Sequence, residues 1–182
     1  NGNDQSNKTN VYLAEYRFNR EIISLGRLNV TSGAYFQQSF SQASLYAGSG
    51  SNKNTLENYA AFIQLEKKLI KKLLVSAGFR AEYFEMNNKD AQLEPILRAG
   101  LNYQLTEGTF IRCSYGQGYR YPTIAEKFIE TGAGGISVFP NPEVRPESSW
   151  NAEAGIKQGF KIGNFFGFAD IAVFEQRYHN TI

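Results

Sequence analysis

Apolar and polar side chains alternate along most of this chain with a period of two residues. Successive side chains of a β-strand point to opposite faces, so this period predicts strands with one apolar and one polar face. The clearest run covers residues 73–83, where Val75 and Phe79 share one parity while Arg80 and Glu82 share the other. Further runs cover residues 11–18, 27–40, 59–66, 97–104, 111–116, 150–157 and 169–176. The pattern predicts about eight strands, and a tilted strand needs about 9–11 residues to cross a bilayer.

The connections between these runs fall into two classes of length. Short connections are expected near residues 70–71, 105–108 and 161–164, and long polar ones at 41–55, 87–94 and 119–148. The two classes alternate along the chain, as in an up-and-down outer-membrane barrel with tight turns at one end and longer loops at the other. The chain is therefore predicted to be all-β, an antiparallel up-and-down transmembrane β-barrel segment.

Aromatic residues should mark both ends of the apolar face. The chain has 14 Phe and 11 Tyr, and aromatic residues make up 14% of it. We expect Tyr59, Tyr83 and Trp150 near the long-loop end, since aromatic rings favour the boundary between lipid and water. The rings expected at the short-turn end are Tyr103, Phe110, Phe160 and Phe165.

Composition and charge exclude several kinds of chemistry. One cysteine, Cys113, rules out an intrachain disulfide, and with one histidine, His179, no His/Cys metal site is expected. A net charge of +2 gives no reason to expect nucleic acid as a partner. Catalytic constellations are also lacking in the sequence. We therefore expect no cofactor, no metal and no enzyme activity.

Two motifs in the second half of the chain are more specific. Residues 112–126 read RCSYGQGYRYPTIAE, and residues 141–155 read NPEVRPESSWNAEAG. In this order and at this spacing they resemble the TonB-dependent receptors, whose pattern is SYG-x-G-[FY]-R-x-P followed by A-E and then by NP-[DE]-L-[KR]-PE. Val144 stands where that family usually has leucine.

The resemblance implies that residues 1–182 are part of a 22-stranded barrel, about eight of its strands, without the plug domain and the remaining strands. Such a receptor lies in the bacterial outer membrane and imports a scarce nutrient: a siderophore, haem, cobalamin or a glycan. TonB drives the import through an N-terminal region that this chain lacks. The implied partners are therefore the receptor's own plug domain, the missing strands, TonB, membrane lipid and an extracellular small molecule. The polar residues 1–10 and the end at Ile182, inside an expected strand, also fit a fragment.

The connection at 119–148 contains local structural signals. Pro122 should end the preceding strand, because proline restricts its own φ and the conformation of the residue before it. Thr123 followed by Glu126 is a capping box, so a short helix is predicted from about Ile124 to Ile129. Residues 131–135 should form a flexible stretch. An extended segment is predicted through Pro142 to Pro146.

Candidate ligand-binding residues fall into two groups. Tyr119, Arg120 and Tyr121 lie at the expected rim, where they could stack on or pair with an anionic ligand. Three further candidates, Arg80, Arg98 and Arg112, should face the lumen. A structural role is the alternative for both groups, with the rim residues holding the loop and opposite lumen charges forming a ladder.

Two other readings of the pattern stay open. Eight strands can close into a small outer-membrane barrel with an adhesion, anchoring or small-ligand role. The inward positions expected for Gly78, Gly100, Gly116 and Gly155 favour a wider barrel, because a small lumen must be filled by side chains. A soluble β-rich binding module would need protein to bury the apolar face. If the chain is a fragment, its first and last strands should not pair.

Overall fold

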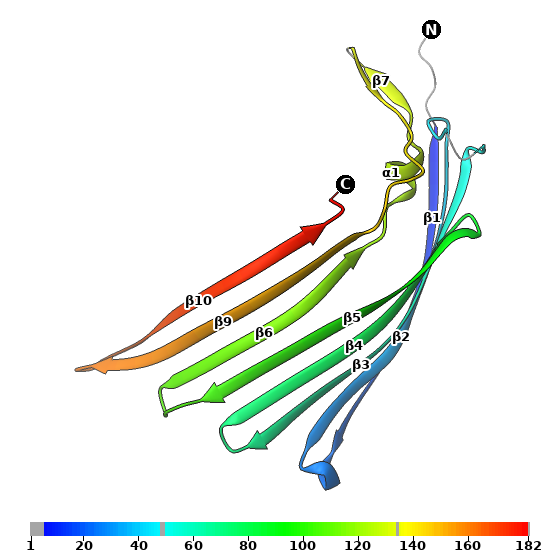
Figure 1. Cartoon of the computed structure of the whole chain (residues 1–182). Helices are drawn as coiled ribbons and strands as arrows, with labels where there is room; N and C mark the ends of the chain where they lie inside the picture. The colour runs from blue at the N-terminus through cyan, green and yellow to red at the C-terminus, as the bar shows by residue number, and fades with distance from the viewer. Residues whose placement is uncertain (1–5, 48–49, 134, 182) are drawn as a thin grey trace.

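One curved antiparallel sheet makes up most of the molecule (Figure 1). The computed structural model describes residues 6–47, 50–133 and 135–181. Eight strands pair in the order β1-β2-β3-β4-β5-β6-β9-β10, and β7 pairs with β8 in a separate two-stranded sheet. The elements are β1 (Asn7–Ile22), η1 (Ile23–Leu25), β2 (Leu28–Ala43), β3 (Lys53–Ile70), β4 (Leu73–Met86), β5 (Lys89–Gln104), β6 (Thr109–Arg120), α1 (Ile124–Phe128), β7 (Thr131–Ala133), β8 (Ile136–Val138), β9 (Glu147–Ile162) and β10 (Phe165–His179).

The predicted strands are confirmed, and each is longer than its clearest run. The long loop expected at 87–94 is wrong. Strand β4 continues to Met86 and β5 starts at Lys89, so only Asn87 and Asn88 connect them. Both asparagines have positive φ, 55° and 54°, as a two-residue hairpin turn requires. Loop lengths therefore do not alternate strictly, because this turn is as short as those at the opposite end.

The strand register separates the sheet into an apolar and a polar face, since residues directly opposite each other share a face. One row across the sheet contains Leu73, Tyr103, Ile111, Ile156 and Ile171. We call this side the apolar face. The apolar positions of the alternating runs lie on it, among them Leu73, Val75, Phe79, Leu97, Leu101, Ile111 and Ile171. The other side, the polar face, contains Arg80, Glu82, Arg98, Asn102, Arg112, Glu153 and the four predicted glycines.

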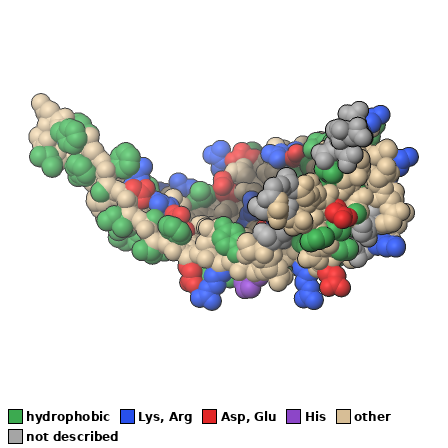
Figure 2. Space-filling view, turned by 90° about the horizontal axis from the view of Figure 1, so that it is seen from above, with side chains coloured by type: hydrophobic (Ala, Val, Ile, Leu, Met, Phe, Trp, Pro, Cys, Tyr) green, Lys and Arg blue, Asp and Glu red, His purple; other side chains and the backbone are tan. Residues whose placement is uncertain are grey.

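Aromatic rings border the apolar face at both ends of the strands. At the long-loop end the rings of Phe36 and Tyr59 lie 5.0 Å apart, and those of Tyr59 and Tyr83 lie 6.2 Å apart. At the short-turn end Phe160 and Phe165 lie 6.3 Å apart. Figure 2 shows hydrophobic side chains gathered on the far-left arm, where Figure 1 places the turn between β9 and β10. This distribution agrees with the predicted rings at both ends, except for Phe110. Phe110 lies opposite Lys157 and next to Ile111 along β6, so it is on the polar face and its predicted place on the apolar face is wrong.

The eight-stranded sheet is open. Strands β1 and β10 lie at its two edges, and within the described residues no ladder joins them (Figure 1). The prediction that the first and last strands do not pair is confirmed, and the closed eight-stranded barrel is contradicted. Each edge leaves a row of unpaired backbone groups, which another strand must satisfy in lipid. Separately, no helix in the described part of the chain is long and apolar enough to cross a membrane.

The connection from β6 to β9 folds over the polar face at the long-loop end. It begins after Arg120, so the predicted strand break at Pro122 is confirmed. Helix α1 follows with both hydrogen bonds of the predicted capping box. A small hydrophobic core forms where this connection meets the end of β4. Its buried members are Phe84, Met86, Tyr121, Ile124 and Phe128. We call residues 121–146 the rim loop.

The rest of the rim loop differs from the prediction. The expected flexible stretch at 131–135 contributes instead to the hairpin β7–β8, although Gly134 lies outside the described residues. The proline segment is not continuously extended, because the Val144 amide donates to the Asn141 carbonyl over 3.2 Å and closes a turn. A backbone turn can form there because no proline occupies position 144.

Candidate functional site on the polar face and the rim

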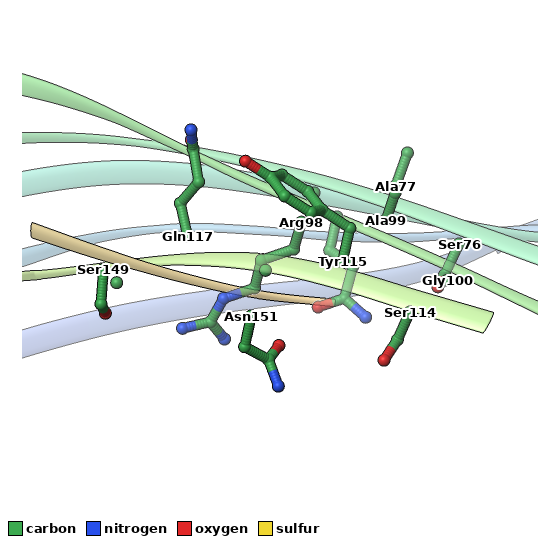
Figure 3. A pocket seen from close by; sticks show the side chains of 14 residues that line it. Ser76, Ala77, Arg98, Ala99, Gly100, Ser114, Tyr115, Gln117, Ser149 and Asn151 are labelled. Atoms are coloured by element: carbon green, nitrogen blue, oxygen red, sulfur yellow. The ribbon is translucent and has the colours of Figure 1, made fainter. Parts of the chain in front are cut away.

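A polar groove crosses the polar face between β3 and β9. Its volume is about 510 Å³. Figure 3 shows the side chains of Ser76, Arg98, Ser114 and Asn151 on one side of the sheet, while Tyr115 and Gln117 point to the other. Three of the predicted inward glycines also line the groove, at positions 78, 100 and 116. The groove exists because positions without side chains lie between polar residues.

Arg98 is the cation of this groove. Among the described residues it has no carboxylate partner, and the groove lining contains amides and hydroxyls but no acid. A Cβ at Gly116 would lie 3.9 Å from Cγ of Arg98 and 3.7 Å from Oδ1 of Asn151. Gly116 therefore leaves open the space between the aliphatic part of the Arg98 side chain and the Asn151 amide. Such an arrangement can hold an anionic group, because guanidinium and neutral donors all offer hydrogens.

Arg80 is held by its neighbours. Its Nη2 lies 3.1 Å from Oε1 of Glu82, and its guanidinium lies 5.6 Å from the ring centre of Tyr35. The ring of Phe62 is 5.9 Å away and packs over Gly33, where a Cβ would lie only 2.5 Å from Cζ of Phe62. Phe62, the exception in the alternating pattern of its strand, thus lies on the polar face as a platform for arginine.

Arg112 connects three strands. Its Nε donates to Glu153 on β9 over 3.0 Å, and its Nη1 donates to both carboxylate oxygens of Asp170 on β10 over 2.6 and 2.8 Å. The guanidinium lies directly over Gly155, whose Cβ, if present, would be 3.0 Å from Cζ of Arg112. The predicted charge ladder is thereby found for Arg112 as well as for Arg80. In the alternating run 169–176, Asp170 has the parity opposite to Ile171, but this pattern does not identify Asp170 as the partner of Arg112.

At the rim, Arg120 ties the loop to the sheet. Its Nε donates to Glu147 over 2.8 Å, and its Nη1 donates to Glu126 over 2.8 and 3.1 Å. These carboxylates, Glu147 first, raise the pKa of the Arg120 guanidinium. Burial alone would raise the pKa of Glu126, but hydrogen bonds from Thr123 and Arg120 outweigh it and lower that pKa. Arg120 thus holds the rim loop against the end of the sheet.

Tyr119 and Tyr121 pack into the core of the rim loop. The ring of Tyr121 stacks on Phe84 at 4.9 Å with an interplanar angle of 9°. Tyr119 lies 5.6 Å from the same ring, and its buried hydroxyl has no hydrogen-bond partner among the described residues. The six predicted site residues therefore form two separate groups, one at the rim and one along the polar face. The groove residues Gln64, Ser114 and Asn151 were missed, although their parity matched the polar side of each strand.

A family model described as "TonB dependent receptor-like, beta-barrel" matches residues 1–182. The chain belongs to the TonB-dependent receptor family. Curated protein sequences contain no match to it. The resemblance suggested by the two motifs is thereby confirmed, and it extends over the whole chain.

Solved structures similar to this receptor chain include the siderophore receptor PirA from Pseudomonas aeruginosa, with a TM-score of 0.79 and 17% identity over 96% of this chain and 33% of that one. A Serratia marcescens hemophore receptor HasR, in a complex with HasA and heme, matches with a TM-score of 0.79 and 14% identity over 96% of this chain and 34% of that one. The copper transporter OprC matches with a TM-score of 0.64 and 14% identity over 93% of this chain and 30% of that one. At these identities the likeness shows the fold. The chain spans about a third of the length of these structures.

Proposed function

We propose that this chain is part of the wall of a bacterial outer-membrane receptor that imports a scarce nutrient with energy delivered by TonB. The main observation behind the proposal is that the sheet is a single layer and its apolar face is exposed. Large side chains on that face are exposed, with Phe79 at 44%, Leu97 at 49% and Ile171 at 67%. Water disfavours an apolar surface of this extent, whereas lipid covers it without cost.

The open edges support a larger barrel. Strands of 12 to 18 residues are long enough to cross a bilayer when tilted. In lipid, β1 and β10 each require a neighbouring strand, so we propose that residues 1–182 are one section of the barrel and that further strands and a plug domain complete it. TonB would act through the N-terminal region of the complete receptor.

The polar face supports a role in lining the transport path. Of the six candidate residues, Arg80, Arg112 and Arg120 are held in ion pairs, and the two tyrosines pack at the rim. Arg98 is the candidate best placed to contact an anionic group, either on the plug domain or on the ligand. The neighbours in fold include receptors named for a siderophore and for a hemophore, and we propose a ligand of the siderophore, haem, cobalamin or glycan class.

Uptake by the complete receptor tests this function. In cells lacking their own copy, expression of the receptor should place it in the outer-membrane fraction and restore growth on one member of a panel of ferric siderophores, haem, cobalamin and glycans. Growth should disappear when TonB is deleted. Arg98→Gln should weaken uptake, whereas Arg17→Gln, on the same face but on the edge strand β1, should not. A receptor found outside the outer membrane, or uptake independent of TonB, would refute the proposal.

A further inference from the structure

Strands β5 and β6 separate from each other toward the long-loop end of the sheet. The ladder between them ends at Arg98 and Gly116. Beyond that point β5 continues to pair with β4, and β6 continues to pair with β9, each to its last residue at that end. Figure 1 shows β5 bending toward its hairpin with β4 while β6 runs up to α1. We call the opening between residues 93–97 of β5 and residues 117–119 of β6 the seam.

The side chains at the seam favour separation of the two strands. The Leu97 amide donates to Oε1 of Gln117 over 2.9 Å, so a side chain takes the place that a backbone carbonyl has in the ladder. Pro95 follows two positions further along β5, and alternate residues of a strand direct their backbone groups toward the same neighbour. Because proline has no N–H, β5 offers no donor across the seam at this position. The opening is therefore a property of the sequence on both edges.

The seam lies at the height of the apolar belt. Leu97 is directly opposite Phe79, and Leu93 is directly opposite Tyr83 in the row of aromatic rings at the long-loop end. The opening therefore spans the part of the apolar face between an aliphatic row and the aromatic row. Lipid chains offer no hydrogen bonds to backbone groups, so in a membrane we expect a molecule with polar and apolar parts to fill the opening.

A cavity of about 200 Å³ occupies the seam. On the apolar side its lining includes Trp150, whose ring lies 6.3 Å from that of Tyr115. Three residues line both this cavity and the groove that contains Arg98: Gln117, Gly118 and Ser149. The groove on the polar face thus adjoins the seam, which leads toward the side of the sheet proposed to meet lipid.

The two ends of this route differ in chemistry. At the inner end the guanidinium of Arg98 has no carboxylate partner among the described residues. At the outer end Leu93 and Leu97 are 65% and 49% exposed. Between them the seam cavity contains Glu94, which accepts a hydrogen bond from Gln92. An anionic group is therefore favoured at Arg98 rather than inside the seam, and an apolar chain is favoured along the outer side.

We propose that the seam admits, from the surrounding leaflet, a ligand with one acyl chain and a carboxylate, which binds with its carboxylate at Arg98 and its chain in the seam beside Leu97 and Trp150. The inference rests on the proposed function and narrows its ligand to one that carries an acyl chain. A guanidinium can bind a carboxylate through two parallel hydrogen bonds, and Ser76 and Asn151 offer further donors in the groove. Because the cavity of the seam is small, we expect one chain rather than the two of a phospholipid.

The test uses the complete receptor in phospholipid vesicles and ω-bromododecanoate, a fatty acid whose bromine quenches tryptophan fluorescence. Residues 1–182 contain one tryptophan, Trp150, and its signal is the difference between the receptor and its Trp150→Phe variant. The alcohol ω-bromododecanol, which lacks the carboxylate, corrects for partition into the bilayer. The acid should quench Trp150 at about tenfold lower concentration than the alcohol, and Arg98→Gln should remove this difference. Arg17→Gln, on the edge strand β1, is the matched control and should retain it.

A disulfide across the seam tests the route independently. Leu97→Cys/Gln117→Cys, in a Cys113→Ser background, should lose the quenching by the acid when oxidised and regain it when reduced, because the bond closes the opening. The matched control is Leu101→Cys, which lies directly opposite Cys113 in the paired part of β5 and β6. Oxidation of this control should leave the quenching unchanged.

Several results would overturn the inference. One is equal quenching by the acid and the alcohol, and another is a difference that survives in Arg98→Gln or after oxidation of the seam cysteines. Quenching by a phospholipid with brominated chains that depends on Arg98 in the same way would assign the seam to a membrane lipid instead. The comparison with Arg98→Gln decides alone if the seam cysteines do not oxidise. A receptor that supports TonB-dependent growth on its nutrient while the acid gives no specific quenching of Trp150 refutes this inference and leaves the proposed function standing.

Discussion

The rim loop and the eight-stranded sheet, which we call the wall, are stabilised in different ways. The rim loop has a core of its own, in which Phe84, Tyr121 and Phe128 are 6–7% exposed. Among the described residues the wall has no such core, because its strands form one layer. Ile171 and Phe174, on its two faces, are 67% and 73% exposed. Backbone pairing fixes the order of the strands in the wall, but burial of side chains must come from lipid on one face and from the barrel contents on the other.

This contrast decides how each region should respond to substitution. In the rim loop, a smaller side chain leaves a cavity that its neighbours cannot fill, so truncation is harmful. In the wall, truncation on the apolar face removes only a contact with fluid lipid, and the harmful change is an added charge.

Removing the ring at the centre of the rim core should have the largest effect. Phe84 stacks on Tyr121 and lies 5.6 Å from Tyr119, so Phe84→Ala should cost about 3–5 kcal/mol of local stability. Hydrogen exchange at residues 124–138 of the complete receptor should accelerate, whereas exchange in β9 should not change. Phe79→Ala on the apolar face of the same strand is the control. Equal protection of the rim loop in both variants would show that the loop does not depend on this core.

A charge on the apolar face of the wall should have the next largest effect. Val75 lies opposite Leu101 on that face, at the third position of β4, and Val75→Arg should cost up to about 2–4 kcal/mol, the cost of an added charge at the bilayer midplane. The measurement is the unfolding free energy of the complete receptor in phospholipid vesicles. Gln64→Arg, on the polar face of the neighbouring strand, should leave stability nearly unchanged. A similar loss for both variants would mean that the two faces are not distinguished by lipid.

The sequence predicted the wall better than the rim, for a physical reason. Alternation along a strand is local, so the faces of Val75 and Arg80 could be assigned without knowing their neighbours. The capping box of Thr123 and Glu126 is equally local. In contrast, Phe84 and Met86 are apolar side chains on the polar face, and only the rim loop that covers them explains their position. The turn at Asn87 was missed because it lacks the glycine that usually marks such hairpins.

Partnerships across strands could not be predicted for a related reason. Arg112 reaches Asp170 only because β9 lies between them in a particular register and presents Gly155 beneath the guanidinium. Register depends on the pairing of strands that are distant along the chain.

Gly155→Val tests whether Arg112 holds the last strand of the wall in place. The added side chain would meet Arg112, so the bond from Arg112 to Asp170 should break and β10 should exchange its amide hydrogens faster than β6. Asp170→Asn should accelerate exchange in β10 in the same direction but less, because Arg112 keeps Glu153 as a partner. Gly159→Val, on the same strand but with no arginine over it, is the control. If all three variants exchange alike, Arg112 contributes nothing to holding the last strand.

The smallest expected effect is a pH dependence confined to the rim loop. The folded structure lowers the pKa of Glu126, and an unfolded glutamate has a pKa of about 4.3. The loop contact is therefore fully stabilising above about pH 4.3 and weakens as the pH falls through the lower folded pKa. Hydrogen exchange at Thr123 to Ile129 should accelerate over that interval, while the wall should show no matching change. Glu126→Gln should abolish this dependence, because glutamine can still accept from the Thr123 amide but does not titrate in that range. A dependence that persists in Glu126→Gln would assign it to another carboxylate and remove the proposed role of Glu126 in coupling the helix to Arg120.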